Sequence, residues 1–250
     1  MAVNAGGGHI APAFSCIDII TTLFYRFLNI DPKNPEGSDR DRFLLSKGHG
    51  CAALYVTLAR RGFFPEQQLN LFCQPEGILG GHPDRSIPGV EVSTGSLGHG
   101  LSLGVGMALA ARLDKKTWRT FVLMSDGECH EGSVWEAAQA AGHFGLDNLV
   151  LTIDYNKLIS LGPINDIIRV EPLADRWRSF GWEVSEVDGH DIPQLVEVYS
   201  RLPFRRGRPN LVLAHTTKGK GVSYMENRPI WHYRIPNEEE LKQALKELES

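Results

Sequence analysis

The sequence predicts an α/β fold in which helices flank a doubly wound parallel sheet. Short apolar runs, typical of buried strands, alternate with longer segments whose apolar residues recur at helical spacing. Glycine-rich turns stand directly before several of these helical segments. The clearest unit is the stretch 120–162, which is expected to form a strand, a helix and a second strand. We therefore expect ligands to bind where the strands end.

The remaining elements follow the same alternation along the chain. After a flexible turn at 6–8, apolar residues from Phe14 to Phe27 recur at helical spacing and predict a buried helix. Strands are expected at 42–45, 121–124, 149–153, 182–187 and 211–216. Helices are expected at 51–60, 101–113, 133–144, 172–180, 193–201 and 238–248.

The composition is that of an ordinary globular chain and excludes several classes of partner. With 42% hydrophobic and 22% charged residues, the chain can bury one sizeable core, so we expect a single domain over residues 1–250. A net charge of −4 gives no basic field for nucleic acid. No apolar run in the sequence is long enough to cross a membrane, and no signal-peptide pattern opens it. The four cysteines form no Cys-x-x-Cys pair, which indicates a reducing cytoplasm.

Two polar side chains close the strands of the central unit. Asp126 follows the expected strand 121–124, and Asn156 follows the strand 149–153, thirty positions later. The parallel strands of such a unit end at the same edge of the sheet, which brings the two side chains together. A carboxylate and an amide oxygen beside a glycine and a helix N-terminus suit a small hard cation that carries phosphate oxygens. The stretch is therefore interpreted as a clamp for a metal ion and a diphosphate.

Two short patterns in this stretch carry a family resemblance. Asp126 opens the pattern Asp-Gly-x-x-x-Glu-Gly, and Asp154 opens Asp-x-Asn-Lys about thirty residues later. Together they resemble the thiamine-diphosphate motif, and the sequence around them is similar to transketolases over essentially the whole chain. The resemblance implies the diphosphate-binding domain of the thiamine-diphosphate fold, with thiamine diphosphate and Mg²⁺ as cofactors.

The resemblance also implies which residues contact the cofactors. Asp126, Asn156 and the backbone carbonyl of Leu158 would ligate Mg²⁺. A glycine-flanked turn at 46–50 and a second glycine turn at 95–100 would bring the backbone close to the cofactor. The expected cofactor-binding residues are His49, Gly95, Ser96, Leu97, Gly127, Glu131, Asn156 and His232.

Four residues are expected to be catalytic by the same resemblance. His9, His82 and His232 would contact the sugar and move protons. Glu131 would lie at a subunit interface near the cofactor's pyrimidine and relay protons between two sites. The alternative is a helix cap for His9 and an exposed loop residue for His82. The chain departs from the family at 10–12, where Ile-Ala-Pro replaces Pro-Gly-Gly, and at Tyr233, which replaces a usual glycine.

Several residues near these motifs are given structural roles. His130 and His143 are expected to be structural, with His143 on the packed side of its helix. His190, at the end of the strand 182–187, is expected to orient its neighbours. The turn Lys218-Gly219-Lys220-Gly221 lacks the upstream glycine of a phosphate loop and is expected to be a flexible covering loop.

The resemblance implies only half of an enzyme. Thiamine diphosphate needs a second, pyrimidine-binding domain, and nothing after Gly162 offers one of comparable size. The chain then resembles the N-terminal subunit of a split transketolase, which transfers a two-carbon ketol unit from a ketose or ketose phosphate to an aldose or aldose phosphate. A separately encoded C-terminal subunit would complete it, in an α₂β₂ heterotetramer.

Three other functions remain open at this point. A related thiamine-diphosphate enzyme, acting on an unusual sugar or making acyloins, would keep the clamp and change the histidines. A nicotinamide-dependent dehydrogenase is outlined loosely by Gly98, Gly100 and Gly104 with Asp126 at the next strand end, but the spacing is not that of the dinucleotide fingerprint. A non-catalytic binding partner would keep the fold alone.

Overall fold

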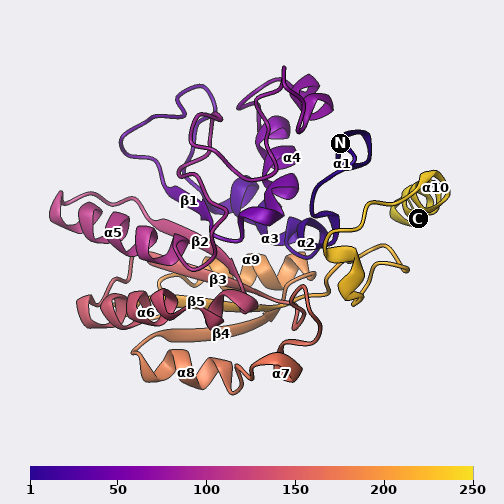
Figure 1. Ribbon diagram of the computed structural model, residues 1–250. Coiled ribbons are helices and arrows are strands. Elements are labelled where there is room, and N and C mark those ends of the chain that lie inside the picture. The colour runs from indigo at the N-terminus through magenta and orange to yellow at the C-terminus, as the bar shows by residue number, and fades with distance from the viewer. Residues whose placement is uncertain (250) are drawn as a thin grey trace.

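The computed structural model describes residues 1–249 and places a five-stranded, entirely parallel sheet at the centre of the molecule (Figure 1). The strand order is β1-β2-β3-β5-β4, which confirms the predicted doubly wound α/β fold. The strands are β1 (Arg42–Leu45), β2 (Thr120–Ser125), β3 (Leu149–Tyr155), β4 (Glu183–Asp188) and β5 (Asn210–His215).

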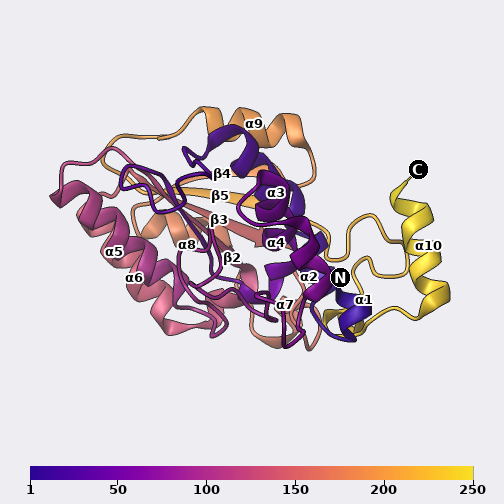
Figure 2. The same cartoon turned by 90° about the horizontal axis from the view of Figure 1, so that it is seen from above.

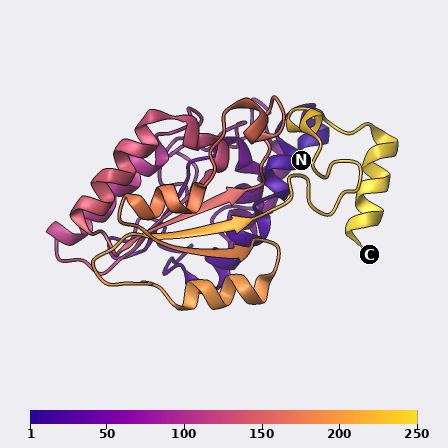
Figure 3. The same ribbon diagram turned by 90° about the horizontal axis from the view of Figure 1, so that it is seen from below.

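Helices cover both faces of this sheet. In Figures 2 and 3, α9 lies on one side of the sheet, and α5 and α6 lie on the other. None of the helices within residues 1–249 is long and apolar enough to cross a membrane. The helices are α1 (Ala2–Ala5), α2 (Ile10–Phe14), α3 (Ile17–Thr22), α4 (Cys51–Arg61), α5 (Gly100–Leu113), α6 (Gly132–Phe144), α7 (Ile164–Ile167), α8 (Leu173–Ser179), α9 (Ile192–Ser200) and α10 (Glu238–Leu248).

The alternation of side chains along each strand divides the core into two layers. On β2, Phe121 and Leu123 pack into the cluster that contains α3, α4 and α9, whereas Val122 and Met124 pack into the cluster that contains α5, α6 and α8. All six residues of β2 are buried. A strand that is buried on both faces is mostly apolar, which is why the sequence shows short continuous apolar runs rather than alternation.

The register of the two central strands places the polar motifs side by side. Ser125, the last residue of β2, pairs with Asp154 of β3. Asp126 follows β2 directly and Asn156 follows β3 directly, so both stand at the carboxyl edge of the sheet. The crossover expected from the sequence is therefore confirmed.

The single helix expected from Phe14 to Phe27 is wrong in detail. The structure divides this segment into α2, α3 and a π-helical turn at Leu23–Phe27, with a break at Ser15 and Cys16. The Ser15 hydroxyl lies 2.6 Å from a carboxylate oxygen of Asp154 and 3.0 Å from the carbonyl of Pro12. Serine side chains that bond to backbone carbonyls compete with regular helix, and periodicity alone does not reveal the break.

The C-terminal segment forms a small unit beside the sheet. Figure 1 shows α10 at the margin of the molecule, near the N-terminal α1. Its Ala244 packs into a separate small core with Ala11 of α2, Val222, Met225 and Trp231. This anchoring holds the segment that leads to the 3₁₀ turn Pro229–His232 against α2, next to the carboxyl edge of the sheet.

Candidate functional site

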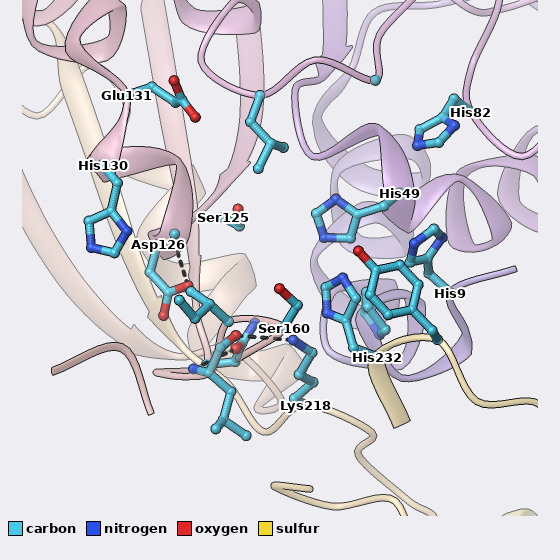
Figure 4. A pocket seen from close by; sticks show the side chains of 18 residues that line it. His9, His49, His82, Ser125, Asp126, His130, Glu131, Ser160, Lys218 and His232 are labelled. Carbon is cyan, nitrogen blue, oxygen red and sulfur yellow. Dashed lines mark hydrogen bonds between the residues drawn. The ribbon is translucent and has the colours of Figure 1, made fainter. Parts of the chain in front are cut away.

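A cavity of about 320 Å³ lies at the carboxyl ends of the strands, where the fold class places ligands. In Figure 4 the four histidines at positions 9, 49, 82 and 232 lie on one side, with Asp126, His130 and Glu131 across from them. The cavity is lined by His9, Pro12, His49, His82, Gly95, Leu97, Ser125, Asp126, Gly127, His130, Glu131, Asn156, Leu158, Ile159, Ser160, Lys218, His232 and Tyr233.

The structure brings nearly all of the predicted site residues into this cavity. Every predicted catalytic residue and every predicted metal ligand lines it, as do the predicted cofactor contacts, with one exception. Ser96 instead lines a neighbouring shallow hollow together with Thr94, Gly95 and His99. A backbone contact from Ser96 needs no side chain in the cavity, so its predicted role stays a prediction.

Asp126 is the buried carboxylate of the predicted metal site. It is 1% exposed, and its two oxygens accept the backbone N–H groups of Gly127 at 2.7 Å and Lys157 at 2.6 Å. Burial raises the pKa of Asp126 to about 7, and the nearby Asp154 carboxylate adds to the effect. Because its negative charge is unfavourable in this buried position, the Asp126 carboxylate would be stabilised by a bound cation.

The other two predicted ligands adjoin Asp126 through the same turn. The Asn156 side-chain oxygen accepts the backbone N–H of Leu158 at 3.1 Å, which fixes the direction of the amide. The Leu158 carbonyl accepts a hydrogen bond from the Lys218 ammonium at 3.0 Å. Each of these oxygens keeps a second lone pair for a further partner.

The donor set fits Mg²⁺ in its chemistry. It consists of one carboxylate, one amide oxygen and one carbonyl, and Mg²⁺ bound between protein and phosphate uses one or two carboxylates with oxygens from the substrate and water. Within residues 1–249, no three histidine, cysteine, aspartate or glutamate side chains are grouped as a metal centre. Phosphate oxygens and water would have to complete the coordination of an ion held by this set.

Lys218 is a site residue that the sequence did not reveal. The loop around it was expected to be a flexible cover, but Lys218 is 2% exposed and lines the cavity. Burial, together with the neighbouring Lys47 charge, lowers the pKa of the Lys218 ammonium to about 8. Lys218 lies in a glycine turn just after β5, as Asn156 lies just after β3. A polar residue just after a parallel strand pointed to Asn156, and the same pattern would have identified Lys218.

The four histidines form one cluster. The ring of His9 lies 5.6 Å from that of His49, 6.0 Å from that of His82 and 5.3 Å from that of His232, measured between centroids. Burial lowers the pKa of His9, of His49 and of His232, the last to about 3, and nearby cationic and imidazole groups add to it. These three imidazoles are therefore neutral near pH 7.

Two of these imidazoles keep an unused nitrogen. The Nδ1 atoms of His9 and His232 are buried and have no hydrogen-bond partner among the described residues. Leaving a buried polar atom unpaired costs about 1–3 kcal/mol. Two such atoms in one cavity indicate that a polar ligand or ordered water completes the site.

A buried ion pair supports the histidine side of the cavity. The Lys47 ammonium, which also donates to the Pro12 carbonyl at 2.9 Å, contacts the Asp154 carboxylate. Ser15 and Thr216 donate to the same carboxylate. Burial acts to lower the pKa of Lys47, but the charge and hydrogen bond of Asp154, together with the nearby Cys16 and Asp126, raise that pKa overall. Lys47 is thus a fixed cation two residues before His49.

Glu128 ties three loops of the site together. Its Oε1 accepts the Ser46 hydroxyl at 2.6 Å and the Gly98 N–H at 3.0 Å, and its Oε2 accepts the Ser125 N–H at 2.9 Å. The side chain is fully buried, and this burial raises its pKa. Sequence reasoning assigned Glu128 no role because its partners lie 82 and 30 residues away, or within its own turn.

One glycine in each of the two cofactor loops allows a close contact with a neighbouring segment. A Cβ at Gly48 would lie 2.7 Å from Thr94 Oγ1 and 3.0 Å from the backbone nitrogen of Gly95. Gly98 has φ +84°, and a Cβ there would lie 2.6 Å from the Cβ of Glu131. A side chain at Gly48 would collide with the 94–95 backbone and one at Gly98 with the Glu131 side chain, so both positions require glycine.

Three histidines given structural roles have different outcomes. His130 lines the cavity and its Nε2 lies 2.9 Å from the Ile168 carbonyl, so its structural role stays a prediction. His143 is exposed and not on the packed side of α6, which is contrary to the prediction. His190 orients its neighbours as predicted: its Nε2 accepts the Thr217 N–H at 2.8 Å, so its Nδ1 is free to donate to Asp18 at 2.8 Å.

Comparisons with known proteins agree with this geometry. The family described as "Transketolase, thiamine diphosphate binding domain" matches residues 2–249. The chain is 43% identical to an apulose-4-phosphate transketolase subunit of Phocaeicola vulgatus, over 98% of this chain and 87% of that protein. It is 41% identical to the 6-deoxy-6-sulfo-D-fructose transketolase subunit SqwG of a Clostridium species, over 98% of this chain and 89% of that protein.

Solved structures give the same result. The crystal structure of transketolase from Campylobacter jejuni superimposes with a TM-score of 0.92 and 31% identity. The superposition covers 98% of this chain and 40% of the Campylobacter enzyme, so the chain spans about two fifths of that protein. With a family match over nearly every residue and relatives above 40% identity, this chain belongs to the transketolase family and carries its thiamine-diphosphate-binding domain.

Proposed function

We propose that this chain is the N-terminal subunit of a split transketolase, which transfers a two-carbon ketol unit from a ketose or ketose phosphate to an aldose or its phosphate. The observation that carries the proposal is the single cavity that Asp126 and Asn156 line together with the four-histidine cluster, with Asp126 across from the histidines in Figure 4. A metal-diphosphate clamp and a set of neutral proton carriers in one cavity are the parts that the reaction needs from this chain.

The clamp side of the cavity is proposed to hold the cofactors. Asp126, Asn156 and the Leu158 carbonyl would hold Mg²⁺, and His49, with the backbone at 95–97 and Gly127, would contact the diphosphate. When bound, thiamine diphosphate supplies the electron sink for ketol transfer.

The histidine side is proposed to handle the sugar. His9, His82 and His232 would donate and accept hydrogen bonds to the sugar hydroxyls and move protons there. Neutral imidazoles suit this role, because each carries one donor and one acceptor nitrogen. The unpartnered Nδ1 atoms of His9 and His232 support it. Glu131, exposed at the N-terminus of α6, is proposed to relay protons where two subunits meet.

The assembly is proposed to be two-part. The chain is a single diphosphate-binding domain, and a separately encoded C-terminal subunit would bring the pyrimidine-binding domain, in a cytoplasmic α₂β₂ heterotetramer. Two relatives named as subunits of apulose-4-phosphate transketolase are covered to 87% and 90% of their length, whereas the rat transketolase is covered to 39%. This difference supports a two-chain enzyme. The dehydrogenase outlined by Gly98, Gly100 and Gly104 has no support from the family match.

The substrates are proposed to be sugars outside the common set. Two relatives are named for apulose-4-phosphate and for 6-deoxy-6-sulfo-D-fructose. The departures from the family pattern at 10–12 and at Tyr233 lie on the sugar side of the cavity, where Pro12 and Tyr233 are lining residues. Branched and sulfonated ketoses are therefore the first donors to test, beside the ordinary ketose phosphates.

Reconstitution with the partner tests the proposal. The chain would be produced together with a separately encoded pyrimidine-domain protein, and ketol transfer would be measured with thiamine diphosphate and Mg²⁺ present. We expect activity in the complex, none in either chain alone, and at least a hundredfold loss in Asn156→Ala. A complex that binds the cofactor but transfers no ketol unit from any ketose would overturn the proposed function.

A further inference from the structure

Tyr233 is an exposed aromatic residue at the edge of the cavity. It follows the 3₁₀ turn Pro229–His232 and lines the cavity, although 66% of the residue is exposed. Within residues 1–249 the Tyr233 ring contacts two other aromatic rings, and the Tyr233 hydroxyl has no hydrogen-bond partner. A large, half-apolar side chain with a free hydroxyl is thus presented to the entrance.

The two rings that Tyr233 touches belong to the proposed sugar site. The centroid of its ring lies 5.0 Å from that of His9 and 4.5 Å from that of His232. These are the same two histidines whose Nδ1 atoms lack partners. A sugar held by both imidazoles must therefore pass alongside the Tyr233 ring.

We infer that Tyr233 is a specificity-determining residue, which selects ketoses by the size of the part that lies beyond the transferred two carbons. This inference rests on the proposed function. The transferred carbons would react at the cofactor, and the remainder of the ketose would extend past His9 and His232 toward the exposed Tyr233. The Tyr233 ring occupies the space beside His9 and His232, so donors with a short remainder fit there and donors with a long remainder are rejected.

The ring and the hydroxyl make separable contributions. The ring occupies volume and presents an apolar face to sugar carbons, whereas the hydroxyl can form one hydrogen bond to a distal sugar oxygen. A difference of one carbon in a close-fitting pocket changes kcat/KM by roughly 10–200-fold. A side chain that only shapes the entrance changes the ratio of kcat/KM between substrates and leaves cofactor binding alone.

The test compares ketose phosphates of increasing length in the reconstituted complex. We would measure kcat/KM for D-xylulose 5-phosphate, D-fructose 6-phosphate and D-sedoheptulose 7-phosphate in the wild type and in Tyr233→Ala. The ratio of the seven-carbon to the five-carbon donor is expected to rise by about tenfold in Tyr233→Ala. In Tyr233→Phe the ratio is expected to stay within twofold of wild type, because the ring remains.

A matched control separates the side chain from its turn. Ile230 lies in the same 3₁₀ turn, is 65% exposed and does not line the cavity. Ile230→Ala is expected to leave all three kcat/KM values within twofold of wild type. Thiamine diphosphate affinity, measured by calorimetry, is expected to be unchanged in every variant. An unchanged donor ratio in Tyr233→Ala would overturn the inference while the proposed function stands.

A binding measurement keeps the inference testable if the complex transfers nothing. Saturation-transfer NMR would then rank the three ketose phosphates by affinity for the complex with cofactor and Mg²⁺. A ranking that favours the five-carbon sugar in the wild type and is lost in Tyr233→Ala would support the inference. The same ranking in both proteins would overturn it.

Discussion

The carboxylate of Asp126 accepts the backbone N–H of Lys157 at 2.6 Å, across 31 residues of sequence. This contact joins the end of β2 directly to the end of β3, at the residue after Asn156. The carboxylate is held in place by backbone donors, so its geometry does not depend on an ion. The β2–β3 connection therefore positions the carboxylate of the proposed Mg²⁺ site. The ion would neutralise the charge of a carboxylate that is already in place.

Removing the charge at Asp126 tests this arrangement. Asp126→Asn keeps the size of the side chain and one acceptor oxygen, but it cannot offer an anionic ligand to Mg²⁺. We expect Mg²⁺-dependent binding of thiamine diphosphate to weaken by at least a hundredfold, as measured by calorimetry on the reconstituted complex. Binding at wild-type affinity in Asp126→Asn would show that the ion sits elsewhere.

The pH dependence of Mg²⁺ binding follows from the raised pKa of Asp126. Because this pKa is about 7, the carboxyl is protonated in most molecules below that pH and must lose its proton to bind the ion. Mg²⁺ affinity is expected to be constant above pH 8 and to fall by nearly tenfold for each unit below pH 6.5. Asp126→Asn should show no such slope, and calorimetry in buffers of different ionisation enthalpy would detect the released proton.

The sheet and its edge could be predicted from the sequence because both depend on local patterns. Short apolar runs indicated the strands, and the spacing of Asp126 and Asn156 indicated their meeting point. Ser15 breaks the expected helix because its hydroxyl bonds to Asp154, 139 residues away, and no pattern within a helical window contains that partner. Residues whose roles arise from distant buried partners are the ones that sequence reasoning missed.

Lys47 and Asp154 are a pair of this kind, and breaking it is expected to destabilise the fold. Both side chains are fully buried, so Lys47→Met leaves an uncompensated carboxylate in the core. Loss of one partner of a buried pair costs about 3–5 kcal/mol of the free energy of unfolding. Denaturant unfolding of the single variant would measure this cost.

The double variant is the informative control for this pair. Asp154→Asn removes the buried charge and keeps groups that can bond to Ser15 and Thr216. Lys47→Met with Asp154→Asn is therefore expected to recover at least half of the lost stability. Equal destabilisation in the single and double variants would mean that lost packing, and not the buried charge, causes the effect.

Glu128 is expected to control the positions of the cofactor loops. In Glu128→Gln one acceptor oxygen becomes an amide donor, which faces N–H or O–H donors from Ser46, Gly98 or Ser125. At least one of these bonds is lost, which costs about 1–3 kcal/mol of stability. Thiamine diphosphate affinity is expected to fall about tenfold, because the loops around Gly48 and Gly98 separate. Glu136, exposed on α6, gives the control Glu136→Gln, which should match wild type in calorimetry and in thermal unfolding.

The depressed pKa of His232 predicts how stability changes with pH. Burial lowers this pKa to about 3, against about 6.5 in the unfolded chain, so between these values the unfolded state binds a proton that the folded state does not. Stability therefore falls as the pH falls below 6.5. Asp126, whose folded pKa is raised, contributes in the opposite direction below pH 7, so the net slope of the wild type alone does not isolate His232.

The comparison of wild type with His232→Asn isolates it. The unfolding temperature of His232→Asn should fall less between pH 7 and pH 5 than that of the wild type. The control His143→Asn, at an exposed position of α6, should keep the wild-type dependence of unfolding temperature on pH. If wild type and His232→Asn show the same dependence, His232 is protonated in the folded protein.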